Sequence, residues 1–396
     1  MIQRLEAPFQ LSRRGPRPLM LHLGLAWMKS ARLTTESLNW NDVWLNCLNI
    51  NSPLDLEITG RPFEELLKQD KALIAGIAAY RQAGYVRALE DPPTIWTEEE
   101  TRLLDYGGTG PTVLFVPSLV NRAYILDLMP DASMLRWLAG QGLHPFLLDW
   151  GWPGDVERRF SLTDYIAGRL ERALSVLPKP VILAGYCMGG LLALAAALRD
   201  QSAGRAVSAL ALLATPWDFH ADNIQAARMA VDIVPFIEGA LQFSNTLPID
   251  VLNTFFAMVD PFGVGEKYRS FAAQDKNSLR ARRFVAMEDW LADGVPLVAP
   301  VAREALCGWY GANTTLRGQW RVAGLAVDPA GLRIPCFCAM PARDRLVPIA
   351  SAKALADKLS KVMVIQPQAG HIGMVAGTHA ESYLWRPFKE WAHALS

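Results

Sequence analysis

The chain has 396 residues, 51% of them hydrophobic and 20% charged, a balance typical of a globular protein with a large buried core. Lysine plus arginine and aspartate plus glutamate both total 39, so there is no overall basic field and we expect no nucleic-acid partner. The five cysteines show no metal-binding or disulfide spacing, which predicts no metal site and a reducing, cytoplasmic location. No apolar run reaches the roughly 18 residues of a membrane span.

The first part of the chain, residues 1–95, is predicted to be a helical N-terminal extension. Apolar positions recur near a 3.6-residue period from Phe63 to Leu89, and Asp91-Pro92-Pro93 ends the pattern. This periodicity is typical of packed helices and does not indicate a sheet.

A mostly parallel sheet with helices on both faces is predicted from residue 112 onward. Continuous apolar runs separated by helical stretches are typical of strands that are buried on both faces. They occupy residues 112–117, 144–150, 181–186, 207–214, 335–340 and 362–365, and a closing helix is expected over 379–395. Between residues 219 and 332 the alternation lapses, which predicts an inserted lid. The expected domains are therefore the extension 1–95, a core of 96–218 and 333–396, and the lid 219–332.

The segment Gly185-Tyr186-Cys187-Met188-Gly189-Gly190 has the setting of a nucleophile elbow, because it follows an apolar strand and precedes a helix-forming run. The tight turn leaves no room for side chains at Gly185 and Gly189, and Gly190 permits close packing of helix on strand. A helix N-terminus favours the thiolate of Cys187, and the N–H of Met188 is expected to face a developing oxyanion. The alternative is that Cys187 is a small buried apolar residue.

An acid and a histidine are expected on loops after later strands. Asp344 follows the run 335–340, and His371 follows the run that ends near residue 365. Both have the order and the strand-end location that the elbow requires, so Asp344 is the predicted acid and His371 the predicted base. The alternative is that Asp344 is an ordinary loop carboxylate beside an arginine and that His371 is a hydrogen-bonded loop histidine.

Further motifs surround these three residues. They are Val116 to Leu128, Leu148-Asp149-Trp150-Gly151, Thr215-Pro216-Trp217-Asp218-Phe219, Met287-Glu288-Asp289-Trp290 and Gly370-His371-Ile372-Gly373-Met374. Because these motifs occur in this order, the chain resembles the polyhydroxyalkanoate synthases, especially the short catalytic subunits that work with a second subunit. The resemblance implies an α/β-hydrolase fold, a triad of Cys187, Asp344 and His371, and a hydroxyacyl-CoA substrate without any other cofactor. It also implies that the N–H of Val120 is the second oxyanion donor.

The expected function is that of an acyltransferase, which polymerises or transfers hydroxyacyl groups from hydroxyacyl-CoA and releases CoA. A thiolate that attacks a thioester forms another thioester, so the acyl group keeps its transfer potential. The polyester product or the surface of its granule, a homodimer and a second synthase subunit are candidate partners. Two alternatives stay open: a thioesterase or dienelactone-hydrolase-like hydrolase with the same triad, and a noncatalytic granule-associated relative.

Overall fold

The computed structural model describes residues 13–30, 63–204, 207–221 and 224–395. The chain divides into two compact units. One unit combines residues 1–85 with 253–292, and the other combines 86–252 with 293–396. The domain boundaries expected from the sequence, including those of the extension and the lid, stay predictions.

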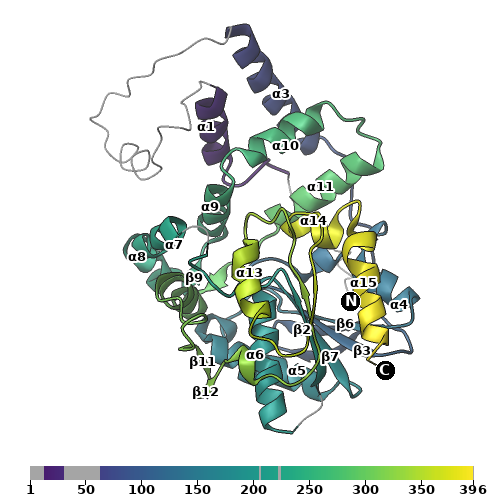
Figure 1. Cartoon of the computed structure of the whole chain (residues 1–396). Coiled ribbons are helices and arrows are strands. Elements are labelled where there is room, and N and C mark those ends of the chain that lie inside the picture. Colours follow the sequence, from purple (N-terminus) through teal and green to yellow (C-terminus); the bar gives the residue numbers. More distant parts are fainter. Residues whose placement is uncertain (1–12, 31–62, 205–206, 222–223, 396) are drawn as a thin grey trace, which may run out of the picture. The chain divides into compact units, whose positions relative to one another are not determined.

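The larger unit contains an eight-stranded sheet in the order β1-β2-β6-β3-β7-β8-β13-β14 (Figure 1). The last six strands in this order, β6 to β14, run parallel to one another, and β1 and β2 join the β6 edge in antiparallel pairing. The strands are β1 (Thr94–Glu98), β2 (Thr101–Asp105), β3 (Thr112–Val116), β6 (His144–Asp149), β7 (Val181–Tyr186), β8 (Val207–Leu213), β13 (Cys336–Ala339) and β14 (Val362–Ile365). The predicted mostly parallel sheet is confirmed, and β1 and β2 were not foreseen.

Helices cover both faces of this sheet. Strands β3 and β7 are buried along their whole length, so their apolar side chains need packing partners on each face. Helices α5 (Glu171–Ser175), α6 (Met188–Ser202) and α13 (Ile349–Ala356) lie on one face, and α4 (Met134–Gly140) and α15 (Arg386–His393) on the other (Figure 1). Phe388 of α15 packs against Phe115 and Phe337, with ring centroids 5.7 and 5.8 Å away.

Three helical segments of this unit are π-helical and not regular α-helices. They are η3 (Asp164–Leu170), η4 (Glu304–Gly311) and η6 (Glu381–Trp385). The π-helix η3 continues into α5, and the closing helix begins as η6 and continues as α15.

Shorter elements complete the larger unit. They are η1 (Ala123–Leu126), β4 (Asp127–Met129), β5 (Ala132–Ser133), η2 (Glu157–Arg159), α7 (Ile224–Asp232), α8 (Val234–Ser244), β9 (Thr246–Leu247), β10 (Leu297–Val298), α12 (Ala299–Arg303), β11 (Arg321–Val322), β12 (Leu325–Ala326), η5 (Pro329–Gly331) and α14 (His371–Ala376). Strands β9 and β10 pair with each other. Strand β9 comes just before the chain leaves this unit through α9 (Ile249–Val259), and β10 comes just after the chain returns.

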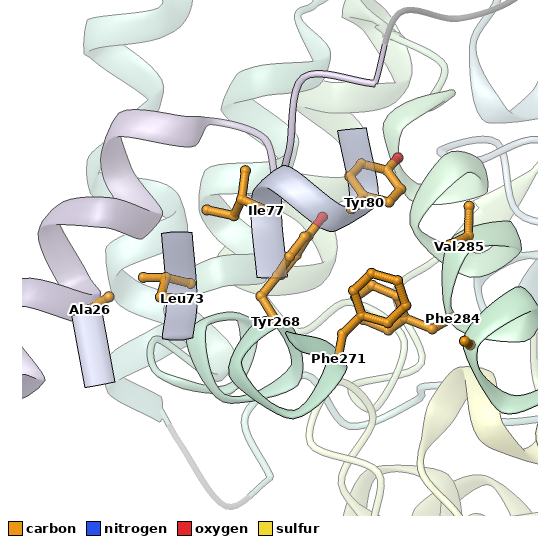
Figure 2. Packing of buried hydrophobic residues seen from close by; sticks show 9 residues of the cluster. Ala26, Leu73, Ile77, Tyr80, Tyr268, Phe271, Phe284 and Val285 are labelled. Carbon is orange, nitrogen blue, oxygen red and sulfur yellow. The ribbon is translucent and has the colours of Figure 1, made fainter. Parts of the chain in front are cut away.

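The smaller unit is built from α1 (Leu19–Ser30), α3 (Phe63–Arg81), α10 (Gly263–Ala272) and α11 (Leu279–Ala292). Its core is aromatic: Figure 2 shows Tyr80 of α3 among Tyr268, Phe271 and Phe284. The Arg13 guanidinium donates two hydrogen bonds of 2.7 Å to the Asp289 carboxylate, which also accepts the Tyr80 hydroxyl at 2.9 Å. Two segments distant in the sequence are therefore joined by one core and one ion pair.

In the described ranges, no helix is both long enough and apolar enough to cross a bilayer.

Candidate active site

Cys187 lies between the last residue of β7 and the first turn of α6, in the strand-turn-helix setting that the sequence predicts. Its backbone has φ 56° and ψ −127°, a conformation that is strained for a residue with a Cβ. Its N–H donates to the Leu213 carbonyl at 2.8 Å, and its own carbonyl accepts the Gly190 N–H at 2.9 Å. The neighbouring strand and the first helical turn thus hold the bend, and the Cys187 side chain is only partly buried.

The glycines of the elbow stand where backbones approach too closely for side chains. A Cβ at Gly185 would lie 2.6 Å from the Gly190 nitrogen, and a Cβ at Gly189 would lie 2.6 Å from the Pro117 carbonyl oxygen. Real Cβ atoms do not make such contacts, so the turn between β7 and α6 requires glycine at both positions. The second contact also shows that the loop after β3 packs against the start of α6.

Asp344 lies on the loop after β13, and its side chain is completely buried. One carboxylate oxygen, Oδ1, accepts the N–H groups of Leu346 and Val347, both at 2.9 Å. The other, Oδ2, lies 2.7 Å from Nδ1 of His371. The two backbone donors fix the orientation of the carboxylate, so that its free oxygen faces the histidine.

His371 is the first residue of α14 and follows β14, and its side chain is 13% exposed. Besides its bond to Asp344, it shares a hydrogen bond with Cys187. Its carbonyl accepts the Tyr186 hydroxyl at 3.2 Å, and the two rings lie 5.1 Å apart. Residues from the ends of three parallel strands thus form one hydrogen-bonded chain from Cys187 through His371 to Asp344.

Electrostatics favours a charged imidazole in this chain. Burial lowers the pKa of His371, but the charge of the Cys187 thiolate and the hydrogen bonds to Asp344 and Cys187 outweigh it and raise the pKa to about 10. Burial, with the nearby charges of Cys187 and Asp344, also raises the pKa of Tyr186 well above its ordinary value. A histidine that favours its charged form beside a cysteine is an arrangement that cysteine nucleophiles use.

The two expected oxyanion donors lie in different environments. Met188 is the first residue of α6, directly after Cys187. The Val120 N–H donates to Ser118 Oγ at 3.2 Å, within the loop after β3. The Val120 carbonyl accepts the Val295 N–H at 3.0 Å, so both backbone polar groups of Val120 are hydrogen-bonded. As a donor to substrate, Val120 would have to give up its bond to Ser118, and its role stays a prediction.

The sequence interpretation did not include Tyr310, on the π-helix η4. Burial and the charge of Cys187 raise the pKa of its phenol to about 12. The phenol is thus within electrostatic range of the sulfur. No apolar period or motif singles out this tyrosine, because its place depends on a π-helical turn that the sequence does not signal.

Within the described residues, no group of three or more His, Cys, Asp or Glu side chains could hold a metal ion.

Comparison with known proteins gives a family and several relatives. Residues 113–383 match the alpha/beta hydrolase family. The poly(3-hydroxyalkanoate) polymerase subunit PhaC of Haloferax mediterranei is 27% identical over 75% of this chain and 62% of its own length. The protein of the same name from Thiocystis violacea is also 27% identical, over 85% of this chain and 94% of its own length. The solved monoacylglycerol lipase of Paleococcus ferrophilus is 12% identical, with a TM-score of 0.48, and the match covers 75% of this chain and 100% of that chain.

These matches differ in how much of each relative they span. This chain covers less than two thirds of the Haloferax mediterranei relative but nearly all of the Thiocystis violacea one. The resemblance to polyhydroxyalkanoate synthases that the motifs indicated is confirmed. Because the family match extends over more than half of its residues, the chain belongs to the alpha/beta hydrolase family.

Proposed function

We propose that this protein is an acyltransferase of the polyhydroxyalkanoate synthase type, which loads hydroxyacyl groups from hydroxyacyl-CoA onto Cys187. The observation that supports this most is the hydrogen-bonded chain of Cys187, His371 and Asp344 at an elbow that leaves the sulfur partly exposed. The relatives named poly(3-hydroxyalkanoate) polymerases supply the substrate class.

In the loading step, the Cys187 thiolate attacks the thioester carbonyl and forms a new carbon–sulfur bond. The bond to the CoA sulfur breaks, and the departing thiolate takes the proton of the His371 imidazolium. The N–H of Met188, at the start of α6, donates to the oxyanion of the intermediate. Asp344 keeps the imidazole in one orientation and stabilises its charged form through the 2.7 Å bond.

In the transfer step, neutral His371 accepts the proton of an acceptor hydroxyl. The resulting oxygen nucleophile attacks the acyl-cysteine, an ester bond forms, and the Cys187 thiolate and the imidazolium are restored. When the acceptor is the hydroxyl of another hydroxyacyl unit, the product is a polyester. When it is water, the product is a free hydroxy acid, which is the outcome expected for the hydrolase alternative.

In the decisive experiment, the purified full chain is incubated with 3-hydroxybutyryl-CoA. CoA release is followed chromatographically, and insoluble polymer is separated from free 3-hydroxybutyrate. We expect polymer from the wild type, none from Cys187→Ala, and unchanged yield from the matched Cys307→Ala variant. Free acid in place of polymer would favour the hydrolase, and CoA release that survives in Cys187→Ala would refute the cysteine mechanism.

The remaining expectations belong to the same proposal. The substrate is a CoA thioester and no further cofactor takes part. The enzyme acts in the cytoplasm, at the surface of its polyester product. A second synthase subunit or a second copy of the chain is the expected partner, and the relatives' names describe them as subunits.

A further inference from the structure

The π-helix η4 carries a tyrosine that the proposed mechanism does not use. Tyr310 is the second-last residue of this element, which directly continues α12. π-helical turns are rare in proteins and occur frequently at functional sites. The π-helix therefore marks Tyr310 as a candidate functional residue of this site.

The loop after β8 leads from the elbow to Tyr310. This loop begins beyond Leu213, the residue whose carbonyl accepts the Cys187 N–H. Seven residues beyond Leu213, His220 Nε2 donates to the Tyr310 carbonyl at 2.8 Å. The Phe219 ring packs edge-on against the Tyr310 ring, with centroids 4.9 Å apart, and stacks on Trp309 at 5.7 Å. The tyrosine is thus held by the loop that follows β8, the strand whose last residue accepts the Cys187 N–H.

A second set of bonds fixes this loop. Asp218 Oδ1 accepts the His220 N–H at 2.9 Å and the Asn313 side-chain amide at 2.8 Å. The carbonyl oxygen of the Asn313 side chain accepts the Phe219 N–H at 3.2 Å. The motif that ends in Trp217-Asp218-Phe219 is therefore hydrogen-bonded to the turn directly after η4, the element that carries Tyr310.

The phenol is a neutral hydrogen-bond donor in an aromatic environment. Within the described part of the chain, the Tyr310 hydroxyl donates to no protein acceptor. With its pKa raised to about 12 by burial and by the Cys187 charge, it stays protonated throughout the neutral range. A half-buried donor without a protein partner gains most from an acceptor that a substrate brings.

The sheet order distinguishes the two sides of the elbow. In the order β3-β7-β8, the loops after β3 and β8 lie on opposite sides of the elbow. The loop after β3 packs on the start of α6, on the side expected for the acyl carbonyl oxygen. Tyr310 is contacted by the loop after β8, on the other side, which leaves its phenol for a second polar group of the acyl chain.

We propose that Tyr310 is a specificity residue, whose phenol donates a hydrogen bond to the hydroxyl of a hydroxyacyl group on Cys187. This inference rests on the proposed acyl transfer and deepens it. A site that hydrogen-bonds a substrate hydroxyl rejects the analogue that lacks it, because the donor is then left without an acceptor.

The test compares single-turnover CoA release from 3-hydroxybutyryl-CoA and from butyryl-CoA, which differ only in the hydroxyl. The wild type should be acylated faster by the hydroxylated substrate. In Tyr310→Phe, the ratio of the two acylation rates should fall about fivefold, which corresponds to one neutral hydrogen bond. Only the reaction of the hydroxylated substrate should become slower. Tyr165→Phe is the matched control, since Tyr165 is also a buried tyrosine on a π-helix but is perturbed by Glu157 and not by Cys187.

The outcomes separate this inference from the function on which it rests. An unchanged preference in Tyr310→Phe, or equal slowing of both substrates, would overturn the specificity role while acylation itself stands. A wild type that neither substrate acylates would overturn the proposed function and this inference with it. The rate at which iodoacetamide alkylates Cys187 should be the same in wild type and Tyr310→Phe, which shows that the elbow is intact.

Discussion

Replacing Cys187 by alanine should lower the pKa of His371 by at least about 2 pH units, a change worth roughly 3 kcal/mol. Burial opposes the imidazolium. Four interactions favour it, in decreasing order: the Cys187 charge, the Asp344 hydrogen bond, the Cys187 hydrogen bond and the Asp344 charge. Cys187 supplies the first and third, hence at least half of the effect that lifts the pKa from 6.5 to about 10 against burial.

The assay is an NMR titration of the histidine ring nitrogens between pH 5 and 11, in protein labelled with ¹⁵N-histidine. The chain has six histidines, and the signal of His371 is the one missing from His371→Gln. Cys307→Ala, at an exposed thiol, is the control and should leave the titration unchanged. If His371 of the wild type titrates near 6.5, or if Cys187→Ala leaves its pKa unchanged, the reasoning about the thiolate–imidazolium pair is wrong.

Three further predictions concern reactivity, stability and access. Limiting iodoacetamide should label Cys187 first, because it lies at the strand-turn-helix elbow, whereas burial raises the pKa of Cys336 to about 12 and that of Cys338 still further. Peptide mapping that finds Cys307 or Cys47 labelled first would contradict this. Cys47 lies outside the described residues. The pKa of folded His371 is raised above its ordinary value, so its imidazolium adds stability that is fully present below about pH 6.5 and is lost as the pH rises through about 10. Asp344→Asn should therefore lower the free energy of unfolding in urea by about 1–3 kcal/mol more at pH 6.5 than at pH 10.5, and equal losses would rule out the ion pair. If residues 219–332 form a lid that opens, limited proteolysis should cut there before it cuts the sheet, and an acyl-CoA analogue should slow the cutting; equal resistance of both parts would argue against a gate.

The parallel strands could be predicted because burial on both faces produces continuous apolar runs, as in the run that became β7. Strands β1 and β2 lack this signal. They lie at the antiparallel edge, where Thr94 is exposed and charged residues such as Glu98 and Arg102 alternate with apolar ones. That residues 1–85 and 253–292 belong to one unit could not be predicted from the sequence either, because the unit rests on contacts between residues far apart in the chain.

For the site, the order of Cys187, Asp344 and His371 along the chain was enough to bring the three residues together. Each follows a strand of the same parallel sheet, so the topology itself places them at one edge. Details that depend on side-chain hydrogen bonds could not be foreseen. The bond of the Val120 N–H to Ser118 Oγ and the clamp of Asp218 on Asn313 are both of this kind.

The smaller unit is assembled from two stretches of chain that the ribosome makes at different times. Tyr80 and Asp289, which are hydrogen-bonded, are 209 residues apart. At about 5–20 residues per second, roughly 10–40 s pass between their synthesis. During that interval the apolar side of α3, with Leu73, Ile77 and Tyr80, has been made but lacks the partners it meets in α10 and α11. The nascent chain therefore exposes the apolar side of α3 while the sheet folds. A chaperone would be needed most at this stage.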